Sequence, residues 1–247
     1  MSKALLLGLA LIMAPIATHA AELQVLAGGG ITGPLNELAR QFESSSGHKL
    51  VIRYGTTPEL IKMATSGTPF DLVVVPREVF RDDGAKAKVQ PGATSDIARV
   101  GLGVAVRAGA PRPDISSEAA LRQTLLKAQS IATVPASAAG AQVLKLFERL
   151  GIAEELKPKI KAHPGPAPMV QALAAGDAEL GLFLINVLTA PGLDVVGPVP
   201  AALDQEIVYT GAVAADSKEA AAARAFIDFL RSPAAQKVIT AKGMTPG

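Results

Sequence analysis

A glycine-rich turn between an apolar segment and an amphipathic helix is the feature that most constrains this chain. Residues 27–34 (AGGGITGP) follow a predicted strand at residues 23–26 and precede a predicted helix at residues 34–43. Such a turn leaves unpaired backbone N–H groups at the start of a helix, a geometry that holds an anion. The residues of this turn that we expect to contact an anion are Gly29, Gly30 and Ile31.

The same order of strand, turn and helix start recurs at residues 55–58 and 135–138, and more weakly at residues 165–168. Thr57 and Ser137 occupy positions typical of helix caps, where a hydroxyl group either caps the helix only or also faces a ligand. Each helix start stabilises a nearby negative charge by roughly 0.3–1 kcal/mol, so several together predict a site for one small anion. The further expected contacts are Thr56, Thr57, Ser137, Ala138, Pro166 and Ala167.

Arg77 directly follows a predicted apolar strand at residues 71–75. Ligands of open α/β sheets bind at the carboxyl ends of the strands, and an arginine there can make a bidentate contact with a carboxylate. We therefore include Arg77 among the expected ligand contacts. The alternative is a solvated side chain on the following segment, residues 77–84, for which the sequence weakly favours a helix.

Strands and helices alternate along the chain after residue 21, which is typical of an α/β fold with mainly parallel sheets. We expect a loop at residues 91–95 and one long strand at residues 97–106. Glycine and proline at residues 108–113 indicate a change of direction, near which we place a domain crossover. The other predicted elements are strands at residues 49–54, 130–134, 159–162, 179–184, 193–199 and 207–214, and helices at residues 58–65, 117–128, 138–150, 168–175, 218–230 and 233–241.

Residues 1–20 are predicted to form a signal peptide. Lys3 supplies the positive charge, residues 4–14 the apolar segment, and residues 18–20 (THA) the small residues of a cleavage site. The apolar segment is too short for a spanning helix, and the alternative interpretation is an N-terminal membrane anchor. The mature chain is therefore expected to begin at Ala21 and to reside in a bacterial periplasm.

Composition narrows the possible partners and cofactors. The 247-residue chain has a formal net charge of +2 and no cysteine or tryptophan. The weak charge argues against nucleic acid, and the missing thiols exclude disulfides and a thiolate metal site. No paired-histidine motif predicts a metal ion either. Residues 28–33 match the dinucleotide pattern G-x-G-x-x-G, but the next strand ends in Arg53-Tyr54-Gly55 without the acidic residue that holds a ribose, so we expect no cofactor. A further alternative for residues 28–33 is a tight turn that requires glycine for packing alone and binds no ligand.

Evidence for catalysis is thin in the sequence. No nucleophile elbow or zinc-protease motif occurs. His163 precedes the turn at residues 165–168 and is the histidine nearest the expected site. A lone histidine is usually structural. If the protein is an enzyme, the candidate catalytic residues are His163, Thr57 and Ser137.

The order of these motifs resembles the periplasmic molybdate-binding proteins and their relatives, which are type II solute-binding proteins of ABC importers. The matching segments are Gly30-Ile31-Thr32, Gly55-Thr56-Thr57, residues 67–72 (GTPFDL), Ala139-Gly140, residues 175–181 (AGDAELG) and residues 232–235 (SPAA). The sequence departs from that pattern in three places. Gly30 stands in place of a serine, Leu182-Phe183-Leu184 lacks an expected tyrosine, and the turn at residues 135–140 is shortened.

The resemblance implies a two-lobed α/β fold with a hinge and an interlobe cleft. The first lobe would comprise residues 21–102 and 209–247, and the second lobe residues 103–208. It further implies a monomer that captures a small anion, an oxyanion or a small carboxylate, and delivers it to an ABC permease in the inner membrane. The alternative function is that of the similar periplasmic isomerases of unsaturated tricarboxylates, such as aconitate isomerase.

Overall fold

The structure, a computed structural model, describes residues 20–203 and 205–247. The signal peptide expected at residues 1–20 therefore lies outside the described residues except for Ala20. Within the described ranges, no helix has both the length and the apolar character needed to cross a bilayer.

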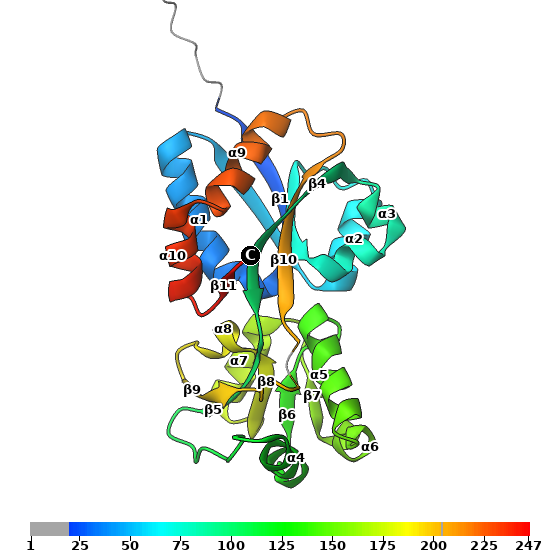
Figure 1. Ribbon diagram of the computed structural model, residues 1–247, viewed down its shortest axis with the longest axis vertical. Helices are drawn as coiled ribbons and strands as arrows, with labels where there is room; N and C mark the ends of the chain where they lie inside the picture. Colours follow the sequence, from blue (N-terminus) through cyan, green and yellow to red (C-terminus); the bar gives the residue numbers. More distant parts are fainter. Residues whose placement is uncertain (1–19, 204) are drawn as a thin grey trace, which may run out of the picture.

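The first lobe is built on a six-stranded sheet with the strand order β11-β4-β10-β3-β1-β2. Its strands β1, β2 and β3 are mutually parallel, whereas β10 runs antiparallel to both β3 and β4. Helices α1, α9 and α10 cover one face of this sheet, and α2 and α3 cover the other (Figure 1). The elements are β1 (Glu22–Gly28), η1 (Gly29–Ile31), α1 (Thr32–Ser46), β2 (Lys49–Gly55), α2 (Thr57–Thr65), β3 (Leu72–Pro76), η2 (Arg77–Arg81), α3 (Asp83–Lys86), β4 (Val89–Val100), β10 (Ile207–Ala214), α9 (Ala220–Leu230), α10 (Pro233–Ala241) and β11 (Thr245–Pro246).

The second lobe is built on a five-stranded sheet with the order β7-β6-β8-β5-β9. Strand β6 is parallel to β7 and β8, and β5 is antiparallel to β8 and β9. The elements are β5 (Leu102–Arg107), α4 (Glu118–Lys127), β6 (Ile131–Thr133), α5 (Ala138–Arg149), α6 (Ala153–Leu156), η3 (Lys157–Lys159), β7 (Ile160–Ala162), α7 (Pro166–Ala175), β8 (Leu180–Leu184), α8 (Ile185–Leu188) and β9 (Leu193–Pro198).

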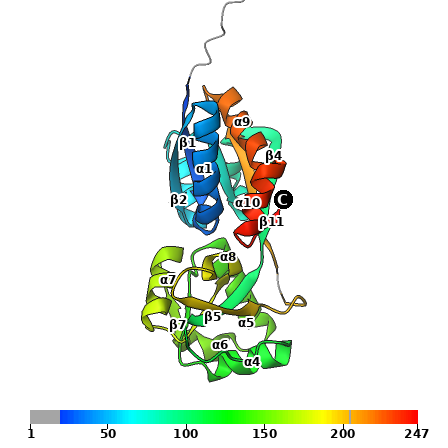
Figure 2. The same cartoon turned by 90° about the vertical axis from the view of Figure 1, so that its left-hand side faces the viewer.

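The chain passes between the lobes at Gly101 and again after β9 (Figure 2). Leu102 already belongs to the second sheet, whereas we expected the first lobe to extend through residue 102. Strand β10 of the first sheet begins at Ile207, whereas we expected the first lobe to resume at residue 209. The single strand expected at residues 97–106 is wrong, because it is divided at Gly101 between two sheets.

The loop expected at residues 91–95 is also wrong, since this segment lies within β4. Proline and glycine suggested a loop there. The pairing of β4 with β10 contains a register shift between Ala212 and Ala214, and Gly92 has a φ of 71°. A β-bulge accommodates both residue types within a strand, which explains the error. The helix expected at residues 77–84 is a 3₁₀ turn followed by a single α-helical turn.

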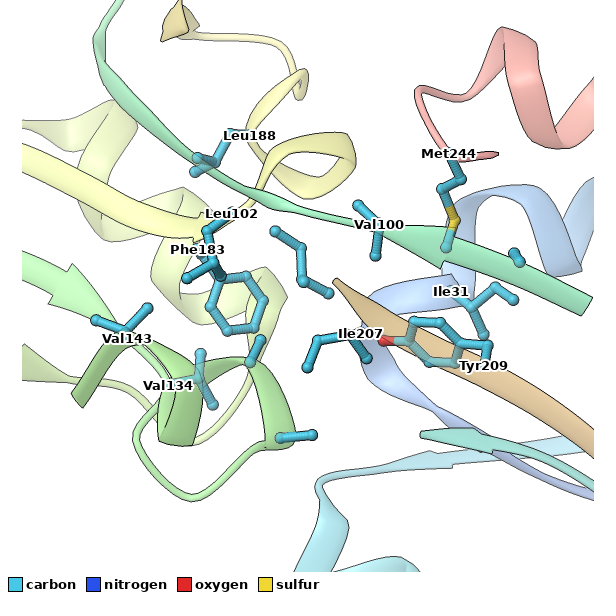
Figure 3. Close-up of a cluster of buried hydrophobic side chains, with 14 of the residues drawn as sticks. Ile31, Val100, Leu102, Val134, Val143, Phe183, Leu188, Ile207, Tyr209 and Met244 are labelled. Atoms are coloured by element: carbon cyan, nitrogen blue, oxygen red, sulfur yellow. The ribbon is translucent and has the colours of Figure 1, made fainter. Parts of the chain in front are cut away.

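Buried side chains continue across the junction of the lobes. Val100, Ile207 and Tyr209 of the first lobe form one cluster with Leu102 and Phe183 of the second lobe (Figure 3). Each of these five side chains is buried. The apolar contact holds the lobes in a defined relation and surrounds the strands that join them.

A substitution at Gly140, in the first turn of α5, tests how closely that helix packs against the residues that follow β6. A Cβ atom at Gly140 would lie 1.9 Å from the carbonyl oxygen of Val134, whereas a Cβ atom at Gly33 in α1 would meet nothing within 4 Å. Gly140→Ala should therefore destabilise the protein by about 1–3 kcal/mol. The matched Gly33→Ala variant should be neutral or gain up to about 1 kcal/mol. Thermal denaturation measures both, and equal melting temperatures for the two variants would contradict this packing.

Candidate ligand-binding cleft

The glycine-rich and helix-start turns from both lobes meet at one small cavity. Its volume is about 20 Å³, enough for roughly one water molecule. The first lobe contributes the ends of β1, β2 and β3 and a side chain of β10, and the second lobe the starts of α5 and α7 and the end of β8. The lining residues are Gly28, Gly29, Gly30, Gly55, Thr56, Thr57, Pro76, Ser137, Ala138, Ala139, Pro166, Phe183, Leu184 and Tyr209.

The structure brings most of the candidate residues together at this cavity. Those that line the cavity are Gly29, Gly30, Thr56, Thr57, Ser137, Ala138 and Pro166. Ile31 is buried beside it, with 1% of its surface exposed. Ala167 lies in a larger groove of about 780 Å³, which shares Gly29, Gly30 and Pro166 with the cavity. The cavity therefore adjoins a groove that runs between α1 and α7.

Arg77 is not among the lining residues. Its guanidinium group forms an ion pair with Asp96 of β4, and more than half of its side chain is exposed. Burial raises the pKa of the Asp96 carboxyl, but the hydrogen bonds from Arg77 and the Thr210 hydroxyl, together with the positive charges of Arg77 and Arg99, lower it below the usual value. Arg77 is thus engaged within the first lobe, and among the described residues no lysine or arginine lines the cavity.

Thr56, and not Thr57 as expected, is the N-cap of α2. The carboxylate of Glu59 accepts hydrogen bonds from the Thr56 backbone N–H at 2.7 Å and from the Thr56 hydroxyl at 2.8 Å. These two bonds, the backbone one foremost, lower the pKa of Glu59. The chain's own carboxylate therefore takes up both polar hydrogens of Thr56.

Thr57 instead connects the two lobes. Its hydroxyl oxygen accepts the backbone N–H of Ala138, the first residue of α5, at 3.1 Å. Ser137 caps α5 by accepting the N–H of Gly140, and its hydroxyl donates to the carbonyl oxygen of Val134. The capping interpretation thus accounts for Thr56 and Ser137, while Thr57 makes a direct contact across the cleft.

Asn186 of α8 makes a second polar contact between the lobes. Its side-chain Nδ2 donates to the carbonyl oxygen of Gly30 at 2.9 Å. Its Oδ1 is buried and has no partner within the described residues. Sequence analysis did not identify Asn186, because nothing local marks an asparagine in a helical turn as a contact to a distant lobe.

Gly28 and Gly30 have close neighbours that explain why these positions lack side chains. A Cβ atom at Gly28 would lie 2.7 Å from Cε1 of Tyr209, and one at Gly30 would lie 2.3 Å from the Tyr209 hydroxyl and 2.4 Å from Leu184 Cδ1. Tyr209 is only 2% exposed. Sequence analysis missed it, although an aromatic residue in the otherwise aliphatic segment 207–214 was an available signal.

His163 is not among the residues that line the cavity. Its backbone N–H donates to the carbonyl oxygen of Thr133, and its Nε2 atom is buried without a partner in the described part of the chain. The three catalytic candidates are therefore not all together at the cavity, which brings together only Thr57 and Ser137. Residues 20–203 and 205–247 contain no cluster of three histidine or acidic side chains that could hold a metal ion.

Comparison with known proteins identifies the family. The chain belongs to the bacterial extracellular solute-binding proteins, whose family model matches residues 23–245. It is 35% identical over 231 residues to an aconitate isomerase from a Pseudomonas species, covering 91% of this chain and 87% of that protein. It is 29% identical over 234 residues to the molybdate-binding protein ModA of Azotobacter vinelandii, covering 92% of this chain and 91% of that protein.

The solved structures show the same architecture. The periplasmic molybdate-binding protein of Azotobacter vinelandii superimposes with a TM-score of 0.77 at 21% identity, covering 91% of this chain and 99% of that one. The two-lobed α/β fold of type II periplasmic binding proteins, expected from the sequence, is thereby confirmed.

Asn186→Ala should shift the protein toward a more open arrangement of its lobes. Loss of one hydrogen bond, worth about 1 kcal/mol, changes the ratio of open to closed molecules about fivefold. Small-angle X-ray scattering should then report a larger radius of gyration. Thr189→Val, which removes a hydroxyl that bonds only within the same turn, is the control. Identical scattering from Asn186→Ala and the wild type would contradict a role in holding the lobes together.

Glu59→Ala should lower stability at neutral pH more than in acid. Because folding lowers the pKa of Glu59 from its ordinary value of 4.5, the stabilisation is present above that value and is lost as the pH falls through the folded-state pKa. We expect a loss of about 0.5–1 kcal/mol at pH 7 and a smaller loss near pH 3. Glu118→Ala, in the first turn of α4, controls for the helix dipole. Melting temperatures that differ from the wild type equally at both pH values would contradict the cap.

Proposed function

We propose that this protein captures a small anion, foremost an organic carboxylate, in the cleft between its lobes. The observation that carries the proposal is the convergence of helix starts from both lobes on one cavity. The N-termini of α2, α5 and α7 all contribute lining residues, namely Thr57, Ala138 and Pro166. Helix N-termini favour negative charge, and their effect is strongest where water is excluded.

An organic carboxylate is favoured over an inorganic oxyanion by two observations. The likeness to an aconitate isomerase is 35% identity over 91% of the chain, against 29% to a molybdate-binding protein. The cavity also adjoins the groove of about 780 Å³ through Gly29, Gly30 and Pro166. That groove has apolar walls, including Pro34, Val170 and Val187, and offers room for the carbon skeleton of a ligand.

In the cell this protein would act after export. The mature chain would reside in the periplasm as a monomer and deliver its ligand to an ABC permease in the inner membrane. Ligand contacts on both lobes favour the closed arrangement, which a permease can distinguish from the open one. No cofactor enters this proposal.

Isomerisation of an unsaturated tricarboxylate is the second candidate, and the likeness to aconitate isomerase is the observation that favours it. The reaction removes a proton from carbon, moves the double bond and returns a proton at the other end, so it needs a base and a proton donor beside the substrate. Among the described residues, the cavity lining offers the hydroxyl groups of Thr56, Thr57, Ser137 and Tyr209 and no carboxylate or imidazole side chain. This lining supports binding ahead of catalysis.

A thermal-shift panel tests the proposal. The purified mature chain is heated with cis-aconitate, trans-aconitate, citrate, molybdate or sulfate. A ligand at a hundredfold excess over its Kd stabilises by about 2.7 kcal/mol. For a chain of this size that corresponds to a rise in melting temperature of about 5–10 °C.

We expect this rise with at least one carboxylate. A shift with molybdate alone would overturn the preference for an organic ligand, and no shift with any anion would overturn anion capture. Proton NMR of each aconitate isomer incubated with the protein separates the two candidates. Binding without interconversion supports transport, and interconversion shows the isomerase.

A further inference from the structure

We propose that the Tyr209 hydroxyl donates a hydrogen bond to the anion in the cleft and thereby orients it. This inference rests on the proposed function and adds a ligand-binding residue from β10, a strand outside the turns that carry the helix starts. Three observations support it: which hydroxyl protons at the cavity are already hydrogen-bonded, the fixed position of the Tyr209 ring, and the protonation state of its phenol.

The hydroxyl groups at the cavity differ in whether their protons are engaged. Thr56 donates to Glu59, and Ser137 donates to the carbonyl oxygen of Val134, so both protons are engaged within the chain. Thr57 accepts the N–H of Ala138, which leaves its own proton available. The Tyr209 hydroxyl oxygen lies against Gly30 and makes no hydrogen bond to an acceptor within residues 20–203 and 205–247, so the phenol proton remains available.

Packing fixes the direction of that proton donor. Tyr209 lies opposite Pro76 of β3 and Ala98 of β4 in the sheet. Its ring packs on Gly28 and its oxygen on Gly30, each close enough to exclude a Cβ atom. Figure 3 shows the hydroxyl oxygen directed away from the first sheet and toward the side where Phe183 of the second lobe lies. A buried side chain held in this way cannot turn its hydroxyl to solvent, and the cavity is the space that it faces.

The phenol stays protonated at any pH that the protein meets. Burial foremost, and then the nearby carboxylate of Glu78, raise the pKa of Tyr209 well above its ordinary value of 10, and the Gly30 backbone offsets only part of this. The residue is thus a neutral donor with a permanent proton. Such a donor matches a fully ionised carboxylate, which accepts hydrogen bonds and has no proton to give.

Tyr209→Phe is the direct test, because it keeps the ring and removes only the hydroxyl. Isothermal titration calorimetry with the carboxylate that gives the largest thermal shift should show affinity lower by about ten- to a hundredfold, the usual effect of losing a hydrogen bond to a charged group. Thr65→Val is the control, since the Thr65 hydroxyl donates to the carbonyl oxygen of Ile61 within α2 and Thr65 lines neither the cavity nor the groove. Its affinity should equal that of the wild type.

A second measurement separates ligand contact from a structural role. The chain has no tryptophan and two tyrosines, so Tyr54 and Tyr209 dominate its near-ultraviolet absorption. In Tyr54→Phe, Tyr209 is the one tyrosine left, so an anion that accepts a hydrogen bond from its hydroxyl should produce a tyrosine difference spectrum in this variant. None should remain when Tyr209→Phe is added to Tyr54→Phe. Unchanged affinity of Tyr209→Phe, or a ligand-saturated Tyr54→Phe without a tyrosine difference spectrum, would overturn the inference alone. Failure of the wild type to bind any anion would overturn the proposed function, and the inference with it.

Discussion

The backbone of Gly30 is the point on which the arrangement of the two lobes depends. Its carbonyl oxygen accepts Asn186 of the second lobe, the Tyr209 hydroxyl of the first lobe lies against it, and Leu184 of the second lobe fills the space where a side chain would be. A residue with a Cβ atom at this position would separate these groups. The absence of a side chain therefore lets both lobes approach the same peptide, beside the N-terminal end of α1 and the cavity.

The cavity is lined by polar groups that carry no formal charge. Among the described residues its lining has neither a basic nor an acidic side chain, and its polar groups are backbone amides and hydroxyls. Dipoles fixed in a nearly dry site stabilise an anion without the desolvation cost of burying a cation beside it. Glu59 modifies this arrangement, because its carboxylate occupies the cap of α2 and leaves Thr57 as the residue of that turn that reaches the second lobe.

Local features of the fold and site could be predicted from the sequence, and features that depend on distant pairing could not. A glycine turn between a strand and a helix is encoded within about ten residues, so the turns at Gly29, Thr57 and Ser137 were found, and the element at residues 233–241 has the predicted bounds. The pairing of Arg77 with Asp96 depends on the position of β4. The proline and glycine near the bulge at Gly92 led us to predict a loop in place of that strand. Tyr209 reaches the cavity only because β10 returns from the second lobe and pairs with β3, a contact that no local pattern specifies.

A crystal structure of the mature chain with the anion that stabilises it most would test the central claim directly. We expect electron density for that anion between the starts of α2 and α5, in contact with the Gly29–Gly30 backbone and with both lobes closed around it. Density for the anion on an outer surface of either lobe, with the cavity beside Thr57 and Ala138 left without it, would contradict this claim.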